Sequence, residues 1–305
     1  MADQIRMRYA VVTGANKGIG FEVCKQLLSK GTIKVVLTAR DEKRGLEAVE
    51  KLKKLGSFSD RIIFHQLQVT DLASIACLAE FIRSKFGKLD ILVNNAGILG
   101  ATLNDGAQKD LGTEGAKKVE WFELMQTGLT QTYDSTVECV EANYYGAKRT
   151  TEALLPLLQL SDSPTIVNVS SSMGKLKFIP SEWAKRILND AENLTEEKID
   201  EVLDVFLKDF KEGSLEAKGW PIHISAYIVS KAAMNAYTRF LAKKYPGFRI
   251  NCVCPGYVKT DGNYNTGGLT VEEGADSLVR LALLPDDGPS GLFFYRHEVA
   301  SFEDA

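Results

Sequence analysis

Residues 9–20 read Tyr9-Ala10-Val11-Val12-Thr13-Gly14-Ala15-Asn16-Lys17-Gly18-Ile19-Gly20. The apolar start predicts a buried strand, and a helix is predicted after the glycines because apolar residues recur at helical spacing, at Phe21, Val23, Leu27 and Leu28. Gly14 permits a tight turn, Gly18 lets the backbone approach a pyrophosphate, and Gly20 lets the helix pack on the strand. Because the N–H groups at a helix start attract anions, the stretch predicts a phosphate-binding unit. The alternative is a glycine turn with a purely structural role.

Beyond this unit, short apolar segments alternate with amphipathic helical stretches. The predicted strands lie near residues 9–13, 33–38, 61–67, 90–94, 165–170 and 249–254. The alternation predicts a parallel sheet with helices on both faces, an α/β fold of the Rossmann-type, doubly wound class, in a single domain over residues 1–305. Ligands of such sheets bind at the carboxyl ends of the strands, and these ends carry Gly14, Asn94, Ser171 and Pro255. The sequence therefore predicts one shared crevice.

The composition argues against several classes of function. The chain carries a formal net charge of −3, so no basic surface for nucleic acid is expected, and no apolar run approaches the length of a membrane span. The N-terminus has no apolar signal segment, and a cytoplasmic location is therefore expected. Five cysteines without a C-x-x-C pair predict reduced thiols, and three scattered histidines predict no metal site.

The run Tyr227-Ile228-Val229-Ser230-Lys231 places a tyrosine and a lysine on one face of a predicted helix. An ammonium group close to a phenolic oxygen favours the phenolate, which lowers the pKa of the tyrosine from its reference value of about 10. The pair is therefore a candidate for proton exchange. A solvated helix face is the alternative interpretation, because this spacing also occurs by chance.

Four features occur in order: TGANKGIG at residues 13–20, NNAG at 94–97, a serine run at 170–172 and the tyrosine and lysine pair. Together they resemble the short-chain dehydrogenase/reductase family, over nearly the whole chain. Within the family the sequence is similar to plant carbonyl reductases of the salutaridine reductase and neomenthol dehydrogenase type, through strings such as VVTGANKGIGFEVCKQL, GKLDILVNNAG and NCVCPGYVKT. The resemblance implies an NADP-binding Rossmann domain and oxidoreductase activity; it does not fix the substrate.

The resemblance implies roles for four residues. Tyr227 would be the general acid that protonates a carbonyl oxygen as hydride arrives from the nicotinamide, and Lys231 would lower its pKa and hold the nicotinamide ribose. Ser171 would orient the same oxygen, and its choice among three adjacent serines rests on motif alignment. Asn143 would hold a water of the proton relay, unless its amide caps a helix or satisfies the core.

The end of the second predicted strand indicates the cofactor. Lys34-Val35-Val36-Leu37-Thr38 is followed by Ala39-Arg40, with no acid to bind a ribose hydroxyl. The resemblance implies that Lys17 and Arg40 bind the 2′-phosphate of NADPH or NADP+, whereas Arg40 would otherwise pair with an acid such as Asp41. Relatives usually have aspartate at the position of Gln68, whose neutral amide predicts modestly looser cofactor binding. The residues implied at the cofactor are Gly14, Asn16, Lys17, Gly18, Ile19, Gly20, Arg40, Gln68, Val69, Asn94, Gly97, Tyr227, Lys231, Pro255, Gly256, Val258 and Thr260.

Two stretches exceed the minimal fold of the family, at about residues 98–135 and 174–222. The first is expected to form a lid over a substrate pocket, or alternatively to pack as plain core. The candidate pocket residues are Leu99, Trp121, Met125, Met173 and Tyr257. In the second, Thr195 can cap a helix with an apolar face, and the resemblance implies that this helical flap covers the surface that other members use for oligomerisation. A monomer is therefore expected.

The predicted function is NADPH-dependent reduction of a ketone to a secondary alcohol. Because few charges surround the predicted pocket, the ketone is expected to belong to a hydrophobic metabolite, a monoterpenoid or an alkaloid. One alternative is an ene-reductase that saturates an enone on the same scaffold, although relatives that reduce the double bond of isopiperitenone replace the tyrosine. The other is a low-turnover NADPH-binding or sensing protein, for which an eroded catalytic set is expected; no erosion is visible.

Overall fold

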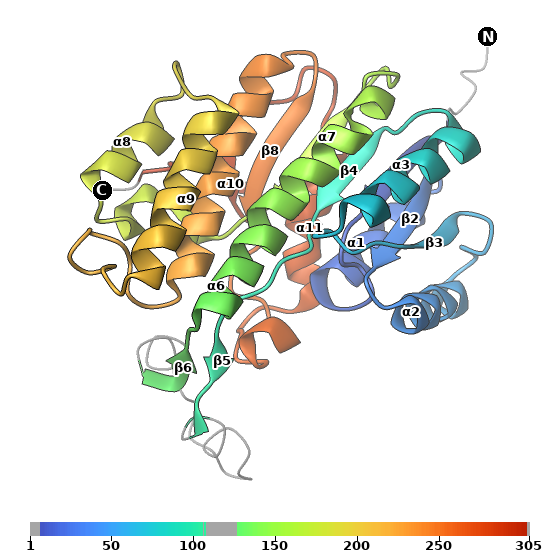
Figure 1. Ribbon diagram of the computed structural model, residues 1–305. Coiled ribbons are helices and arrows are strands. Elements are labelled where there is room, and N and C mark those ends of the chain that lie inside the picture. The colour runs from blue at the N-terminus through green and yellow to red at the C-terminus, as the bar shows by residue number, and fades with distance from the viewer. Residues whose placement is uncertain (1–6, 106, 108–126, 304–305) are drawn as a thin grey trace.

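A computed structural model describes residues 7–105, 107 and 127–303. At its centre is an eight-stranded sheet in the order β10-β9-β8-β7-β4-β1-β2-β3 (Figure 1). Within this sheet the neighbouring strands run parallel, apart from the antiparallel pair of β9 and β10. The strands are β1 Arg8–Val12, β2 Ile33–Ala39, β3 Ile62–Gln66, β4 Ile91–Asn94, β7 Thr165–Val169, β8 Arg249–Cys254, β9 Phe293–Tyr295 and β10 Glu298–Ala300. A separate short pair consists of β5 Thr102–Leu103 and β6 Leu129–Thr130.

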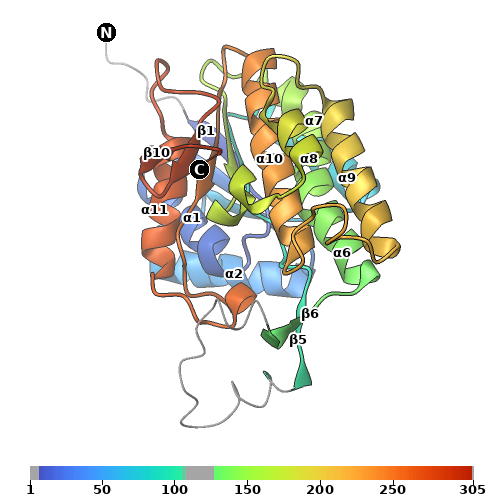
Figure 2. The same ribbon diagram turned by 90° about the vertical axis from the view of Figure 1, so that its left-hand side faces the viewer.

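Helices cover both faces of the large sheet, as Figure 2 shows for α1 and α11 on one side and α7 and α10 on the other. Adjacent residues of β1 illustrate why: Val11 is buried with side chains of α3, α7 and α10, whereas Val12 is buried with side chains of α1, α2 and α11. The helices are α1 Gly18–Ser29, α2 Glu42–Leu55, α3 Leu72–Phe86, α6 Tyr133–Val140, α7 Gly146–Leu158, α8 Glu182–Asn189, α9 Glu196–Lys211, α10 Ser225–Lys244 and α11 Val271–Ala282. The predicted doubly wound α/β fold is confirmed.

The sheet order brings the sequence motifs to one edge. β8, β7, β4 and β1 are consecutive neighbours and all run parallel. Their carboxyl ends lead into residues 255–260, 170–174, 94–97 and 13–20 respectively. Since parallel strands end at the same edge, these four loops lie together at the place where such sheets bind ligands.

The second insert supplies α8 and α9. The Thr195 side chain accepts a hydrogen bond from the Lys198 backbone N–H at 3.3 Å, so Thr195 caps α9 as predicted. The buried face of α9 packs on α6 and α10 (Figure 1) and consists of Ile199, Val202, Leu203 and Phe206. The far end is fixed by Trp220, whose buried indole N–H donates to Asp209 Oδ2 at 2.7 Å. The flap is thus an integral layer outside α10.

Among the described residues, no helix combines the length and the apolar composition that crossing a membrane requires. The cytoplasmic location remains a prediction from the sequence.

Candidate active site

The glycine turn is fixed to the end of β4 by Asn95, a member of the NNAG motif for which no role of its own was predicted. Asn95 donates from Nδ2 to the carbonyl oxygens of Thr13 at 2.9 Å and Gly14 at 3.1 Å. Gly14 has a φ of 61°, and a Cβ there would lie 2.9 Å from Cα of Ala96, so the turn requires glycine. A Cβ on Gly20 would lie 2.5 Å from Nδ2 of Asn95. In the sequence Asn95 is recognisable only as the second residue of NNAG, directly after a buried strand.

The glycine turn lies beside the loop that follows β8. Gly18 has a φ of 58°, and a Cβ there would be 3.7 Å from Cγ2 of Thr260. Next to this contact, Lys17 Nζ lies 2.7 Å from Asp261 Oδ2, and 60% and 63% of the two side chains are exposed. The pair lowers the pKa of the Asp261 carboxyl. Lys17, predicted to bind a phosphate, is therefore paired with a carboxylate from the opposite loop.

Arg40 stands just beyond β2 with its side chain exposed. Its neighbour Asp41 is engaged elsewhere: the carboxylate accepts from the Arg44 backbone N–H at 2.9 Å, caps α2 and lies 3.9 Å from the Arg44 guanidinium. Within residues 7–105, 107 and 127–303, Arg40 makes no ion pair. The pairing of Arg40 with Asp41 that was the alternative is therefore not present.

Asn94, expected beside the adenosine, lies at the end of β4, where its amide is bound by the protein itself. It is 3% exposed and donates from Nδ2 to Thr151 Oγ1 and Asn168 Oδ1, each at 2.9 Å. The side chain links strands inside the sheet because the register of β4 and β7 sets Asn94 opposite Asn168. Gln68 is partly buried and donates from Nε2 to Thr70 Oγ1 at 2.7 Å, which leaves Oε1 as an acceptor. Three other candidate cofactor residues are also partly buried: Asn16, Ile19 and Val69.

The loop after β8 is shaped by Asn263, a second residue that the motifs missed. Asn263 donates from Nδ2 to the Val258 carbonyl oxygen at 2.7 Å and accepts at Oδ1 from the Thr260 backbone N–H at 3.1 Å. The loop begins at buried Pro255, and Gly256 has a φ of 88°. The predicted cofactor segment is thus a preformed turn.

Helix α10 presents Tyr227 and Lys231 on one face. Lys231 is 4% exposed, and its Nζ donates to the Val169 carbonyl oxygen at 2.7 Å and lies 5.7 Å from the centre of the Tyr227 ring. A Cβ on Gly97 would lie 3.4 Å from Lys231 Nζ and 3.0 Å from Asn143 Oδ1. The NNAG segment, α10 and the turn that carries Asn143 therefore meet at Gly97.

The three adjacent serines have different surroundings. Ser170 is 3% exposed and donates to Asn235 Oδ1 at 2.6 Å. Ser171 is partly buried, accepts from the Met173 backbone N–H at 3.1 Å and is hydrogen-bonded to the Tyr227 hydroxyl. Ser171 is therefore the serine that the structure places with Tyr227.

Asn143 lies in a π-helical turn, η2 Glu141–Tyr145, between α6 and α7, and is fully buried. Its Oδ1 accepts from the Ile98 N–H at 2.8 Å, while Nδ2 lies 2.9 Å from the Ile98 carbonyl oxygen and 3.1 Å from Ser230 Oγ. These bonds match the core-satisfying alternative, and they also fix the segment that follows Gly97. Single π-helical turns are common at functional sites.

The pKa of Tyr227 is raised, whereas the sequence predicts that the neighbouring Lys231 lowers it. Burial raises the pKa of Tyr227 well above its usual value, and its hydrogen bond with Ser171 only partly offsets this. The Lys231 ammonium donates to the Val169 carbonyl oxygen and lies 5.7 Å from the centre of the Tyr227 ring. Burial lowers the pKa of Lys231 to about 8. At neutral pH the phenol is therefore a protonated acid rather than an activated phenolate.

The candidate substrate residues are only partly covered by the structure. Leu99, Met173 and Tyr257 are partly buried, and the Tyr257 hydroxyl is hydrogen-bonded to that of Thr266. Trp121 and Met125 lie outside the described residues. Met173 adjoins Ser171, and Tyr257 lies in the loop after β8, so both belong to the same edge of the sheet as Tyr227.

The C-terminal segment braces the chain just after the serines. Leu176 donates its backbone N–H to the Phe302 carbonyl oxygen at 2.9 Å, and Lys177 donates to that of Glu303 at 3.3 Å. The Phe302 ring lies 5.9 Å from the Phe293 ring of β9, with the Arg239 guanidinium of α10 at 5.0 Å. This segment therefore ties the serine loop to both β9 and α10.

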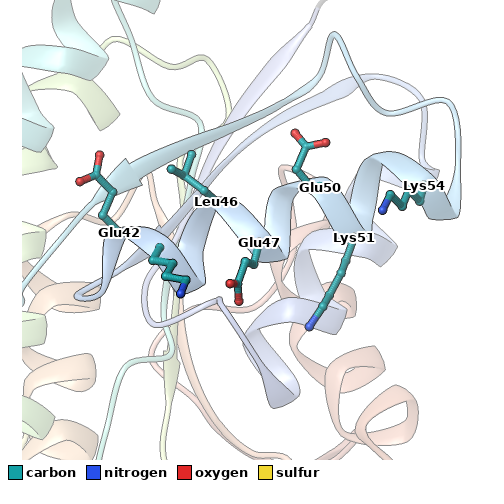
Figure 3. A pocket seen from close by; sticks show the side chains of 7 residues that line it. Glu42, Leu46, Glu47, Glu50, Lys51 and Lys54 are labelled. Atoms are coloured by element: carbon teal, nitrogen blue, oxygen red, sulfur yellow. The ribbon is translucent and has the colours of Figure 1, made fainter.

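A surface hollow lies apart from this edge, on the outer side of α2 (Figure 3). Its lining belongs entirely to that helix and includes Leu46, Glu47 and Lys51. Because no second element closes it, the hollow is not a candidate site. The described residues also contain no group of three or more His, Cys, Asp or Glu side chains arranged to hold a metal ion.

The sequence is similar both to models of protein families and to known proteins. A family model described as short chain dehydrogenase matches residues 8–181, and one described as enoyl-(acyl carrier protein) reductase matches residues 213–283. The chain is 61% identical to (+)-neomenthol dehydrogenase of Arabidopsis thaliana over 298 residues, covering 97% of this chain and 98% of that protein. It is 56% identical to (−)-isopiperitenone reductase of Mentha piperita over 303 residues, covering 95% and 96%.

A solved structure, that of salutaridine reductase from Papaver somniferum, has the same fold, with a TM-score of 0.86 and 54% identity over 94% of this chain and 99% of that one. The family match extends over more than half of the chain, and the relatives align over nearly their full lengths. The chain therefore belongs to the short-chain dehydrogenases, a family of oxidoreductases.

Proposed function

We propose that the protein reduces a ketone of a hydrophobic specialised metabolite, a monoterpenoid or an alkaloid, to a secondary alcohol with NADPH. The observation that carries the proposal is the buried phenol of Tyr227, which is protonated at neutral pH and is hydrogen-bonded to Ser171. A protonated phenol beside a second hydroxyl is suited to bind a carbonyl oxygen and to donate a proton to it.

Each step is assigned to a residue of the chain. Ser171 donates a hydrogen bond to the carbonyl oxygen and fixes its direction. Tyr227 transfers its proton to that oxygen while the carbonyl carbon accepts hydride, and the phenolate left behind is stabilised by the Lys231 ammonium and recovers a proton from solvent. NADPH, when bound, supplies the hydride. Asn143 keeps the NNAG segment in place through Ile98.

The residues at the crevice fit NADPH. The turn at Gly14 leaves no room for a side chain, and it leads into the N-terminus of α1 at Gly18, where free backbone N–H groups suit a pyrophosphate. Arg40 is exposed at the end of β2 and has no ion-pair partner in the described part of the chain, and Lys17 is a second cation on the glycine turn. Two cations, with Ala39 and Arg40 rather than an acid at the end of β2, favour the 2′-phosphate over a bare ribose.

Reduction of a carbon–carbon double bond is the second candidate, because one relative is named isopiperitenone reductase. Overall identity does not separate the two reactions, since relatives of both names are similar at comparable levels. The pair of Tyr227 and Ser171 favours the ketone, because a proton donor placed for a carbonyl oxygen is of most use when that oxygen becomes an alcohol.

The test is NADPH oxidation by purified protein with cyclic monoterpenoid ketones, alkaloid ketones and enones, followed by product identification. A secondary alcohol supports the proposal, and a saturated ketone supports the ene-reductase. Tight NADPH binding without turnover of any carbonyl compound would favour a sensing role.

The ion pair between Lys17 and Asp261 leads to a prediction on cofactor affinity. NADPH has to compete with Asp261 for the Lys17 ammonium, and exposed pairs of this kind contribute up to about 1 kcal/mol. Asp261→Asn is therefore expected to lower the NADPH dissociation constant about two- to five-fold and to change that of NADH less, because NADH lacks the 2′-phosphate. Fluorescence titration of both cofactors at low salt measures the effect.

A matched control is Glu50→Gln, which removes the carboxylate of another exposed pair, with Lys53 at 2.8 Å, far along α2. This variant is expected to bind both cofactors as the wild type does. Weaker NADPH binding by Asp261→Asn would show instead that the carboxylate positions Lys17 for the phosphate.

We further propose that the protein is a monomer, because α9 occupies the outer side of α6 and α10. Light scattering at micromolar concentration is expected to give the 33.6 kDa mass of one chain. A mass of two or four chains would contradict this proposal.

A further inference from the structure

The serine loop is joined to α10 by a buried amide that no motif predicted. Asn235 lies one helical turn after Lys231, on the same face of α10, and is 3% exposed. Its Oδ1 accepts from Ser170 Oγ at 2.6 Å, and its Nδ2 donates to the Gly174 carbonyl oxygen at 3.0 Å. Asn235 thus contacts the residue before Ser171 and the last residue of the turn that follows it, η3 Ser172–Gly174.

Between these two bonds the loop makes a tight turn. The Gly174 N–H donates to the Ser171 carbonyl oxygen at 2.9 Å, and the Met173 N–H donates to Ser171 Oγ at 3.1 Å. A Cβ on Gly174 would lie 2.7 Å from the backbone carbonyl carbon of Lys231, so the turn rests directly on the helix. The distance from Ser171 to Tyr227 is therefore set by the way in which this turn is fastened to α10.

We infer that Asn235 is a positioning residue for Ser171, an inference that rests on the proposed function. The amide is required because one end of the loop offers a hydroxyl donor and the other a carbonyl acceptor, and only a group with both an acceptor and a donor satisfies the two. Aspartate has the same shape but no N–H for the Gly174 carbonyl oxygen, and leucine satisfies neither end. Displacements of about 1 Å at a reacting group cost up to about 10²-fold in rate.

Asn251 provides a matched control because it makes the same kind of contact elsewhere. It is 1% exposed, donates from Nδ2 to the Pro289 carbonyl oxygen at 2.7 Å and accepts at Oδ1 from the Leu292 N–H at 3.0 Å. Asn251 is thus almost fully buried and uses both a donor and an acceptor, as Asn235 does, but its partners lie away from the serine loop.

The experiment compares Asn235→Asp, Asn235→Leu and Asn251→Leu for kcat, for the NADPH dissociation constant and for melting temperature. In both Asn235 variants kcat is expected to fall at least about ten-fold, while the NADPH dissociation constant stays within about two-fold of wild type. Asn251→Leu is expected to have a lower melting temperature and an unchanged kcat. In a Ser171→Ala background, Asn235→Asp is expected to cause little further loss, because the residue acts through Ser171.

Hydrogen exchange over residues 170–178 supplies a readout that needs no substrate, and Asn235→Asp is expected to accelerate it relative to Asn251→Leu. Unchanged exchange in a folded Asn235→Asp variant, or losses that multiply with those of Ser171→Ala, would overturn the inference. If Ser171→Ala leaves kcat unchanged, the proposed role of the serine is wrong. If Ser171→Ala lowers kcat but Asn235→Asp does not, the role of the serine stands and the inference on Asn235 is wrong.

Discussion

Replacing Tyr227 with phenylalanine is expected to lower kcat for ketone reduction by about 10²- to 10⁴-fold, the usual contribution of a positioned general acid. The hydroxyl that is removed is protonated at neutral pH, since burial raises its pKa further, and it is hydrogen-bonded to Ser171. Since the ring remains, NADPH binding is expected to stay within about two-fold of wild type. Steady-state kinetics with the best ketone and a fluorescence titration with NADPH measure the two quantities.

The same helix offers a matched control in Tyr237. Its hydroxyl is buried and has no hydrogen-bond partner among the described residues, so Tyr237→Phe removes an oxygen that does no chemistry. The control is expected to keep the wild-type kcat. Comparable turnover by Tyr227→Phe and Tyr237→Phe would remove Tyr227 from the mechanism.

Replacing Lys231 with methionine is expected to act in opposite directions on activity and on stability. Loss of the ammonium that stabilises the phenolate is expected to lower kcat by at least about 10²-fold. The variant is nevertheless expected to be more stable than wild type at pH 7. Burial lowers the pKa of Lys231 from 10.5 to about 8, which means that keeping this lysine charged in the folded protein costs free energy, and methionine removes that cost. Removing this penalty raises the free energy of unfolding by about 3 kcal/mol. Losing the hydrogen bond to Val169 lowers it by about 1 kcal/mol, so the net gain in stability is about 2 kcal/mol.

The dependence of this gain on pH has a definite sign. Between pH 8 and 10.5 the unfolded chain binds more protons at Lys231 than the folded chain does, so wild-type stability rises with pH in this window. The advantage of Lys231→Met over wild type is therefore full below pH 8 and disappears towards pH 10.5. Urea unfolding of the protein without cofactor at several pH values measures the difference.

Lys148 is the control, a lysine whose Nζ forms an ion pair with Asp200 at 2.7 Å. Lys148→Met leaves that carboxylate without its partner and is expected to destabilise the protein at pH 7. Equal losses of stability in the two variants would contradict a penalty at Lys231.

The fold could be read from the sequence because its signals are local. The apolar segment predicted near residues 33–38 is β2 Ile33–Ala39, and that near 165–170 is β7 Thr165–Val169. β9 and β10 were missed because strands of three residues show no alternation that distinguishes them from loop. The glycine turn was likewise recognisable, because an apolar strand, the glycines and a helical apolar pattern follow one another directly in the sequence.

The polar contacts of the site could not be read in the same way. Asn94 of β4 donates to Asn168 of β7, a contact that depends on the register of two strands more than seventy residues apart. Lys17 and Asp261 are paired across 244 residues of sequence. Periodicity predicts which face of a strand or helix is buried; it does not predict which polar group meets that face from a distant segment.

The bond between Leu176 and Phe302 also bears on the synthesis of the protein. Translation delivers β1, β2 and the glycine turn from the ribosome early, whereas residues 302–303, which brace the chain after Ser171, emerge more than a hundred residues after that serine. A nascent chain that ends before them contains every motif residue, and its serine loop still lacks this support. The crevice is therefore completed only after residues 302–303 have been synthesised, and a chain that stops before them lacks a brace of the active site while keeping all the recognisable motifs.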